Sequence, residues 1–364
     1  MDHRDPVLAR LIDQVDHARS HQLALDIRGG GTKLFYGGLP VGEPLKLGAL
    51  AGISSYEPSE LVVTARAGTL LADLEAALLE RGQCLPFEPP RFAAGGTVGG
   101  MVAAGLSGPA RAKVGSVRDH LLGVTLLNGG GELLTFGGQV AKNVAGYDVS
   151  RLMAGSLGIL GVVCEVSIKV LPIDRATSTV HFDCDESRAL GQLRVWASQP
   201  WPMTAAAWHD GRLWVRLSGA QAAVTAACRT LGGTPLDPGA AGALWTDLRD
   251  HTHEFFGLTE AQLNRGECLW RLSLPATAAP VKLSGRQLIE WNGAERWWRT
   301  QADARDVRAA AAAAGGHATL MRGADKSCGV FSPSSDVLMR IHRGLKQAFD
   351  PARVFNRGRL YAEL

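Results

Sequence analysis

The sequence predicts an α+β protein with two domains and a C-terminal extension. Residues 95–161 hold 17 of the 44 glycines, whereas all nine tryptophans lie between Trp196 and Trp298. After Pro172 the apolar pattern predicts elements in the order β-α-β-β-α, which is typical of an α+β domain with an antiparallel sheet. We therefore expect a glycine-rich domain over residues 1–173, a second domain over 174–322, and a helix and tail over 323–364.

The overall composition is that of an ordinary globular protein with a sizeable core. Hydrophobic residues make up 46% of the chain and charged residues 20%. The net charge of +3 is too small to predict a nucleic-acid partner. No apolar run approaches the ~20 residues that span a bilayer, and the N-terminus lacks the apolar core of a signal peptide. We expect a soluble intracellular protein.

The N-terminal elements lead into a glycine loop. Asp5-Pro6 predicts the capped start of an amphipathic helix, and residues 23–27 predict a short strand. This strand runs into Arg28-Gly29-Gly30-Gly31-Thr32-Lys33, where bare backbone N–H groups and flanking cations are typical of a pyrophosphate site. The spacing is not that of a Walker A loop. A plain flexible turn is the alternative interpretation.

The rest of the first domain is predicted as strands and short helices around two more glycine clusters. Residues 95–105 form one cluster, in which small residues predict a helix that lets a flat ring approach closely. Asn128-Gly129-Gly130-Gly131 predicts a hairpin turn. The predicted strands are 61–66, 121–127, 132–136 and 162–171, and the predicted helices begin near 70, 98 and 147.

In the second domain, Trp297 and Trp298 occupy consecutive positions of a predicted strand. Their side chains should therefore point to opposite faces, and we expect one of them to be exposed at an interface. The predicted strands are 178–182, 204–208, 213–217, 268–274, 287–291, 295–299 and 317–322. The predicted helices are 187–198, 221–231 and 302–314, followed by 336–349 in the extension.

Several short motifs do not support a functional assignment. No glycine cluster has the GxGxxG spacing of a dinucleotide-binding strand–helix turn. Residues 154–158 resemble a nucleophile elbow, but no histidine and acid can be assigned to complete a hydrolase. His251 and His253 are two residues apart and would not share a helix face, so we favour a solvated or capping role over metal binding.

The glycine motifs in their order resemble the FAD-binding domain of the vanillyl-alcohol oxidase (p-cresol methylhydroxylase) family, over about the first 173 residues. The tail is similar to the family's closing Asp-Pro and Asn-containing segment, which returns to the flavin. The length and ending are most similar to the E-type subunits of bacterial glycolate oxidases. The motifs are Arg28-Gly29-Gly30-Gly31-Thr32, Gly96-Thr97-Val98-Gly99-Gly100-Met101, Gly146-Tyr147-Asp148, residues 155–162, Phe349-Asp350-Pro351 and Phe355-Asn356-Arg357-Gly358-Arg359.

This resemblance implies FAD held by two loops, by a third glycine cluster at residues 155–162 and by the tail. Thr32 or Lys33 stands where relatives carry a histidine that binds flavin covalently, so the FAD should be non-covalent. No metal site is expected. The implied cofactor-binding residues are Arg28, Gly29, Gly30, Gly31, Thr32, Lys33, Gly95, Gly96, Thr97, Val98, Gly99, Gly100, Gly158, Gly161, Val162 and Asn356.

The resemblance also implies a function, the oxidation of glycolate to glyoxylate. The implied partners are the two other kinds of subunit in these glycolate oxidases, a homologous D-type flavin subunit and an F-type iron–sulfur subunit. The six cysteines are widely spaced, so the chain has no cluster motif of its own and electrons would pass to the iron–sulfur partner. The implied location is the cytoplasm, or the inner face of the cell membrane through these partners.

The catalytic residues stay unassigned at this stage. The His-Gly-Asp-Gly-Asn segment of D-type relatives, which binds metal or acts on the 2-hydroxy acid, is missing. His317, Arg322 and His342 are the nearest candidates, and each is equally well explained by a structural role. Two alternatives therefore stay open: a stand-alone FAD-dependent dehydrogenase of another 2-hydroxy acid, and a non-catalytic structural subunit with the flavin fold.

Overall fold

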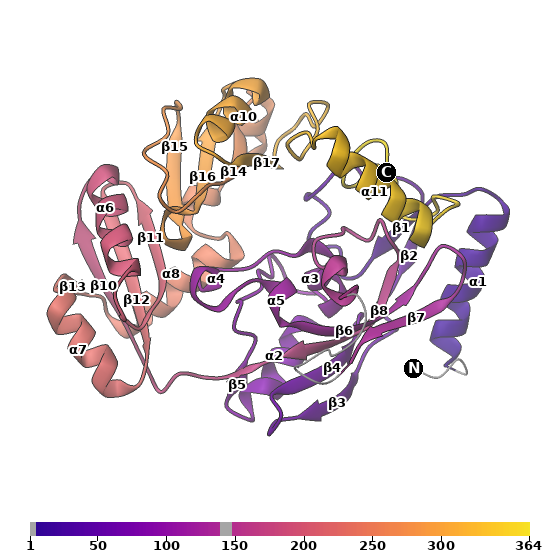
Figure 1. Ribbon diagram of the computed structural model, residues 1–364, viewed down its shortest axis with the longest axis horizontal. Helices are drawn as coiled ribbons and strands as arrows, with labels where there is room; N and C mark the ends of the chain where they lie inside the picture. The colour runs from indigo at the N-terminus through magenta and orange to yellow at the C-terminus, as the bar shows by residue number, and fades with distance from the viewer. Residues whose placement is uncertain (1–4, 139–147) are drawn as a thin grey trace. The chain divides into compact units, whose positions relative to one another are not determined.

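The structure is a computed structural model that describes residues 5–138 and 148–364, and the chain divides into two compact units (Figure 1). The first unit contains Met1–Leu106, Ser116–Pro172 and Pro333–Leu364, and the second contains Ser107–Gly115 and Ile173–Ser332. The short segment 107–115, which the sequence-based division put in the first domain, thus belongs to the second unit. Gly146 and Tyr147 lie outside the described residues. Both belong to one glycine motif, and a helix is predicted to begin near Tyr147.

The first unit is built around a five-stranded antiparallel sheet with the order β3-β4-β8-β6-β7. The apolar residues of β8 are buried almost throughout, as expected for its central position. The hairpin predicted around Gly131 is confirmed, because β6 and β7 pair as far as Leu127 and Leu133. The strands are β3 (Ile53–Glu57), β4 (Val62–Arg66), β6 (Leu121–Leu127), β7 (Leu133–Gly137) and β8 (Val162–Lys169).

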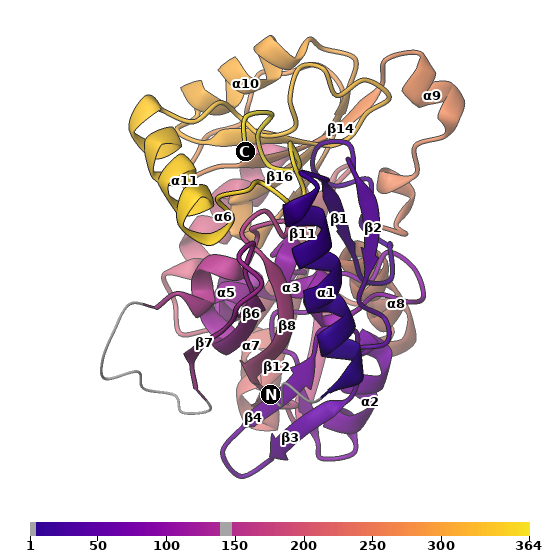
Figure 2. The same cartoon turned by 90° about the vertical axis from the view of Figure 1, so that its right-hand side faces the viewer.

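A second, parallel strand pair in this unit is completed by the tail. β1 (Leu25–Arg28) pairs with β2 (Glu43–Lys46), and Leu25 also bridges to Phe355. Figure 2 shows the pair beside helix α1. The tail therefore packs on the first strand of its own unit. The remaining elements are α1 (Pro6–Ser20), α2 (Leu71–Leu79), β5 (Gln83–Cys84), α3 (Val98–Ala104), α5 (Val117–His120), η1 (Ser150–Met153), β9 (Leu171–Pro172) and α11 (Asp336–Phe349).

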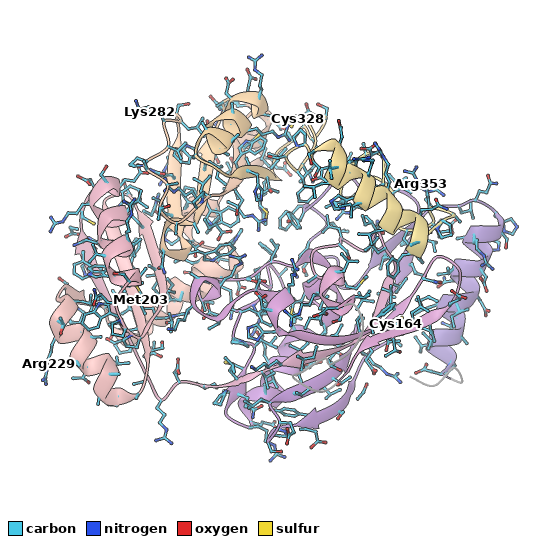
Figure 3. All side chains as sticks on the ribbon, viewed as in Figure 1. Cys164, Met203, Arg229, Lys282, Cys328 and Arg353 are labelled. Carbon is cyan, nitrogen blue, oxygen red and sulfur yellow. The ribbon has the colours of Figure 1, made fainter. Side chains whose placement is uncertain are left out.

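Local sequence explains these elements well. The Asp5 carboxylate accepts the N–H of Val7 at 2.9 Å, so the predicted cap of α1 is confirmed. Leu8 and Val15 on one face of α1 are fully buried in the core of the first unit. Cys164 lies inside this core on β8 (Figure 3), where burial raises the pKa of its thiol to about 12 and leaves it inert.

The second unit contains the predicted antiparallel sheet, with eight strands in the order β13-β10-β12-β11-β15-β16-β14-β17. Its strands are β10 (Ala176–Asp183), β11 (Met203–His209), β12 (Arg212–Gly219), β13 (Thr234–Pro235), β14 (Cys268–Ser273), β15 (Arg286–Glu290), β16 (Glu295–Thr300) and β17 (His317–Arg322). Its helices are α4 (Arg111–Val114), α6 (Glu186–Ala197), α7 (Gln221–Leu231), α8 (Pro238–Asp250), η2 (Glu254–Phe256), α9 (Glu260–Asn264), η3 (Trp291–Gly293) and α10 (Ala304–Ala313).

The two faces of this sheet differ in chemistry around β14. Trp270 pairs with Trp298 on the face that packs against Val307 of α10. Arg271 pairs with Trp297 on the other face. The opposite orientations of Trp297 and Trp298 are confirmed, but the expected exposure is wrong: both are at most 3% exposed, because each face is covered.

The segment 107–115 contacts the second unit at β11 and at Trp291. The indole Nε1 of Trp291 donates to the carbonyl of Gly108 at 3.0 Å. The Arg111 guanidinium lies 4.3 Å from the centroid of the same indole, a cation–π contact. These contacts explain why a stretch flanked on both sides by first-unit residues belongs to the second unit.

Candidate functional site

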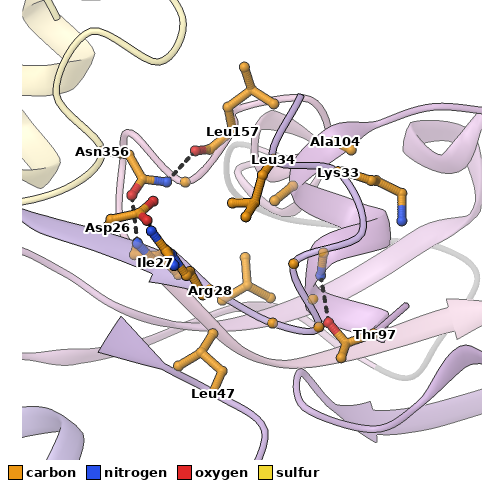
Figure 4. A pocket seen from close by; sticks show the side chains of 18 of the residues that line it. Asp26, Ile27, Arg28, Lys33, Leu34, Leu47, Thr97, Ala104, Leu157 and Asn356 are labelled. Atoms are coloured by element: carbon orange, nitrogen blue, oxygen red, sulfur yellow. Dashed lines mark hydrogen bonds and ion pairs between the residues drawn. The ribbon is translucent and has the colours of Figure 1, made fainter. Parts of the chain in front are cut away.

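A pocket of the first unit collects residues from β1, the first two glycine clusters, the 157–163 loop and the tail (Figure 4). Its walls are largely backbone and apolar side chains, which suits a long ligand with flat apolar parts. The lining residues are Asp26, Ile27, Arg28, Gly29, Gly30, Gly31, Thr32, Lys33, Leu34, Tyr36, Leu47, Thr97, Gly99, Gly100, Ala103, Ala104, Leu157, Gly158, Gly161, Val163, Asn356 and Arg359.

The loops present backbone N–H groups that have no acceptor among the described residues. The N–H groups of residues 29–32 donate no hydrogen bond to any acceptor within 5–138 and 148–364. The same holds for the N–H groups of Gly96 and Thr97 over those residues. Gly29, Thr32, Gly96 and Thr97 are buried or half-buried, where N–H groups are almost always paired, so their unpaired donors indicate an anionic ligand such as a pyrophosphate. Gly30 and Gly31 are exposed and lie between the first two of these residues.

The glycines also allow the two loops to touch. A Cβ on Gly30 would overlap the carbonyl oxygen of Gly95, and a Cβ on Gly29 would overlap the Thr97 hydroxyl. A Cβ on Gly99 would lie 2.6 Å from that of Ala67, which directly follows β4. The absence of side chains at these three positions therefore serves loop packing as well as ligand approach.

Asn356 ties the tail to both walls of the pocket. Its Nδ2 donates to the carbonyl of Leu157 at 2.6 Å, and its Oδ1 accepts the N–H of Ile27 at 2.7 Å (Figure 4). The residue adopts φ 43°, a left-handed conformation that asparagine tolerates well. A Cβ on Gly158 would lie 2.7 Å from the Asn356 Nδ2, so the glycine leaves room for this amide.

Arg359 holds the loop that follows the first glycine cluster. Its guanidinium donates to the carbonyls of Tyr36 at 2.6 Å and Leu34 at 3.3 Å, and it also reaches Gly38. The side chain is 6% exposed, and burial lowers its pKa, although the nearby Asp26 acts in the opposite direction. The arginine therefore sets the shape of this wall of the pocket through its backbone partners.

A buried ion pair supports the tail from behind. Lys346 Nζ donates to Asp350 Oδ2 at 2.8 Å and to the carbonyls of Ile159 at 2.7 Å and Phe355 at 2.9 Å. Asp350 accepts the N–H groups of Val354 and Phe355, each at 2.9 Å. Every group of the pair is thus satisfied, and the third glycine cluster, α11 and the tail are joined at one point.

Most residues implied by the resemblance do lie at this pocket. Residues 28–33 line it, and so do the members of the set at positions 97, 99, 100, 158, 161 and 356. Gly95 instead lines an adjoining hollow with Thr69. Val98 and Val162 are fully buried in the core, and Gly96 accepts the N–H of Leu71 through its carbonyl. These three contribute backbone position and do not line the pocket.

The pocket also contains residues that sequence reasoning missed. Asp26 is buried and forms an ion pair with Arg28, and Tyr36 and Leu157 complete the wall near the tail. Arg359 belongs to the tail motif, and its position close to Asn356 in the sequence could have been used to predict that it lies at the pocket. Asp26 precedes the glycine cluster by three residues and carries no comparable signal.

The histidines and Arg322 singled out by sequence lie elsewhere. His251 ends α8 and His253 caps η2 by accepting the N–H of Phe255 at 3.3 Å, in line with a capping role. His317 and Arg322 are on β17, and His342 is on α11, 5.8 Å from Tyr361 between ring centroids. Over the described ranges, no three His, Cys, Asp or Glu residues are grouped to hold a metal ion.

Comparison with known proteins agrees with the chemistry of the pocket. Residues 8–137 match the family model of the FAD binding domain. The chain is 45% identical to the glycolate oxidase subunit GlcE of Escherichia coli (strain K12), over 97% of each chain. It is also 31% identical to the glycolate oxidase subunit GlcD of Bacillus subtilis (strain 168), over 44% of this chain and 34% of the other.

A solved structure supports the fold alone. An alkyldihydroxyacetonephosphate synthase superposes with a TM-score of 0.63 at 15% identity, covering 96% of this chain and 74% of that one. No helix of the described residues is long and apolar enough to cross a bilayer. The FAD-binding domain of the p-cresol methylhydroxylase type is thus confirmed by its sequence match.

Proposed function

This chain belongs to the family of the glycolate oxidase subunit GlcE, and we propose that it is the FAD-binding subunit of a complex that oxidises glycolate to glyoxylate. The observation that carries the proposal is the pocket in which unpaired backbone N–H groups of residues 29–32 meet the tail residue Asn356. Its donors, glycines and apolar walls fit FAD. The GlcD-type relative supports a complex with a second flavin subunit.

Each part of the pocket has a role in holding the cofactor. We assign the pyrophosphate to the N–H groups of residues 29–32 and of Thr97, which lie at the contact of the two loops. Arg28 and Lys33 flank this position with positive charge. Among the residues that the structure describes, no histidine lines the pocket to form a covalent link, which supports non-covalent FAD.

Bound FAD would supply the acceptor for the hydride that leaves C2 of the hydroxy acid. The first unit would hold the cofactor, and we propose that the second unit, residues 107–115 and 173–332, is the cap domain that contacts the substrate. The six cysteines have no cluster spacing. We therefore propose that electrons pass to an iron–sulfur partner subunit, either in the cytoplasm or at the inner face of the membrane.

One preparation tests the cofactor and the complex separately. The full chain is expressed alone, its flavin spectrum is recorded, and released FAD is quantified after denaturation. We expect close to one FAD per chain, released without proteolysis. Co-expression with the GlcD-type flavin subunit and an iron–sulfur subunit should then give glycolate-dependent dye reduction.

Three results would overturn parts of this proposal. A colourless chain that still assembles with its partners would make it a structural subunit. Bleaching of the flavin by glycolate in the isolated chain, with electrons passed on without partners, would favour a stand-alone dehydrogenase. A bleaching response restricted to another 2-hydroxy acid would exclude glycolate.

A further inference from the structure

Asp26 is an acidic residue in the pocket that we assign to FAD. It lies on β1 two residues before Arg28, and alternate residues of a strand point to the same face, so both side chains line the pocket (Figure 4). The strand is fixed between them, because the Asn356 amide accepts the N–H of Ile27 at 2.7 Å. A negatively charged side chain at a defined position in a pocket for a pyrophosphate requires a specific reason.

One oxygen of the Asp26 carboxylate is engaged and the other is not. Oδ2 accepts a hydrogen bond from Nε of Arg28, with which Asp26 forms an ion pair. Oδ1 accepts no hydrogen bond from residues 5–138 and 148–364. The Asp26 side chain is only 3% exposed and lines the pocket, so a further donor to Oδ1 has to come from the pocket.

A ligand that fills the pocket displaces water from this oxygen. A carboxylate oxygen that loses its water without gaining another donor weakens binding, because the cost of desolvation is not offset. An ionised carboxylate is an acceptor only, so an O–H or N–H of the ligand has to satisfy it. The ligand should therefore present a donor to Asp26.

The place of Asp26 in the chain indicates which donor this is. It precedes Gly29, the first residue assigned to the pyrophosphate, by three residues, which is about 10 Å of extended strand. FAD carries hydroxyl groups on both sides of its pyrophosphate, on the ribose toward the adenine and on the ribityl chain toward the flavin. The adenine amino group and the flavin ring N–H lie at the far ends of the molecule. A hydroxyl group is therefore the donor within reach.

Two arginines offset the charge of Asp26. Arg28 forms the ion pair with it, and Arg359, buried in the wall of the pocket, is also attracted to it. Arg28 and Arg359 repel each other, so the acid between them stabilises both. With two positive charges against one negative charge, Asp26 does not make this end of the pocket negative.

We propose that Asp26 accepts a hydrogen bond from a hydroxyl of bound FAD, on the ribose or on the ribityl chain, and so selects the hydroxylated cofactor. A charged acceptor forms a stronger hydrogen bond than a neutral one. That the ligand is FAD rests on the proposed function. The contact with Asp26 is an additional property of the same pocket.

Fluorescence titration of the full-length apoprotein with three ligands tests this contact. The ligands are FAD, an FAD analogue whose ribose lacks its hydroxyls, and one whose ribityl chain lacks them. The parent should bind FAD roughly 10- to 100-fold more tightly than one of the analogues, and that analogue identifies the sugar. In Asp26→Leu, which has a similar size and no acceptor, this preference should largely disappear. The lost charge acts on the pyrophosphate equally in all three ligands, so it cancels in the ratio.

Two companion variants complete the experiment. Asp26→Asn keeps a carbonyl acceptor without the charge, so it should retain part of the preference, and it provides the comparison if Asp26→Leu does not fold. Asp13→Leu makes the same change as Asp26→Leu at an exposed position of α1 and should leave all three affinities unchanged.

The outcomes separate this contact from the proposed function. A parent chain that binds no FAD would overturn the proposed function and the role of Asp26 with it. Tight FAD binding with equal affinity for all three ligands would overturn the hydroxyl contact alone. A preference for FAD that is unchanged in the Asp26 variants would also overturn it, because a purely structural role of Asp26 weakens the binding of all three ligands alike.

Discussion

The side-chain amide of Asn356 donates to the carbonyl of Leu157 at 2.6 Å and in the same geometry accepts the N–H of Ile27 at 2.7 Å. One residue of the tail thus fixes the separation between β1 and the third glycine cluster. Both contacts involve backbone, and the Asn356 side chain is buried, so they depend on the amide at position 356 rather than on neighbouring side chains. This arrangement makes the tail a structural part of the pocket that we propose for FAD.

Replacing Asn356 with Asp should loosen the pocket. The carboxylate keeps an acceptor for Ile27 but places an oxygen against the Leu157 carbonyl, where a donor is needed. We expect a loss of about 1–3 kcal/mol in the free energy of unfolding and weaker FAD retention. Thermal unfolding and flavin content after gel filtration measure both. Asn264→Asp on the short helix α9 is the control, and an equal effect there would contradict the role of Asn356.

A charge at Thr32 tests the pyrophosphate position. Thr32 lines the pocket and needs no special backbone conformation, so Asp and Asn are both accommodated. Thr32→Asp puts a negative charge beside the phosphates and should weaken FAD binding roughly 10- to 100-fold. The Asn side chain in Thr32→Asn has nearly the same shape as Asp but no charge, so this variant should bind FAD almost as the parent does. Fluorescence titration of the apoprotein gives both affinities, and equal values would exclude a phosphate at this loop.

Gly30 and Gly191 offer a matched pair of glycine substitutions. A Cβ at position 30 would overlap the Gly95 carbonyl, so Gly30→Ala must separate the two loops and should abolish FAD retention. Gly191 lies in α6 with nothing within 4 Å of its Cβ position. Gly191→Ala should instead stabilise the chain by about 0.5–1 kcal/mol. Bound flavin and chemical denaturation are the measurements, and full flavin in Gly30→Ala would refute direct loop contact.

Removal of one partner of the buried ion pair should be severe. Lys346→Met leaves Asp350 ionised and buried, with only its two backbone donors. We expect a loss of about 3–5 kcal/mol in the free energy of unfolding. Lys46→Met, at an exposed position of β2, should change it little. Denaturant unfolding measures the free energy of unfolding of both variants. A loss below about 1 kcal/mol in Lys346→Met would mean that the ion pair does not anchor the tail.

Glu295 should make stability fall as pH rises. The unfolded chain ionises this carboxyl near pH 4.5, whereas burial in the folded chain raises its pKa to about 8. Between these values the folded state binds more protons, so rising pH costs stability until the folded carboxyl also ionises. Melting temperatures from pH 5.5 to 8.5 should decline less in Glu295→Gln than in the parent. The exposed Glu254→Gln should not alter the slope, and parallel curves for all three would contradict the assignment.

The cofactor loops were predictable because their signal is local. A strand followed by Arg28 and three glycines, and a second cluster at residues 95–100, require only neighbouring residues to be recognised, and the structure brings both to one pocket. What the residue types could not reveal is why each glycine is needed. Gly99 lines the pocket, yet its Cβ position is blocked by Ala67, so a substitution there would disturb core packing before it repelled a phosphate.

The features that could not be predicted depend on contacts between residues that are far apart in the sequence. Arg359 reaches carbonyls of residues 34–38, and no periodicity in either segment encodes this pairing. Segment 107–115 reads as part of the first domain, since its assignment to the second unit depends on contacts with β11 and Trp291, which are far away in the sequence. Trp297 and Trp298 are likewise both buried because other elements pack on both faces of the sheet. The residue pattern of one strand does not indicate whether each of its faces is covered.

The contact between Ile27 and Asn356 spans 329 residues, and this has a consequence for biosynthesis. On the ribosome, β1 and its glycine loop emerge long before the tail that completes them. The wall formed by the tail is absent until nearly the whole chain has been translated. If this pocket holds FAD as proposed, a nascent or C-terminally truncated chain would meet the cofactor with an unfinished pocket, and stable loading would follow translation.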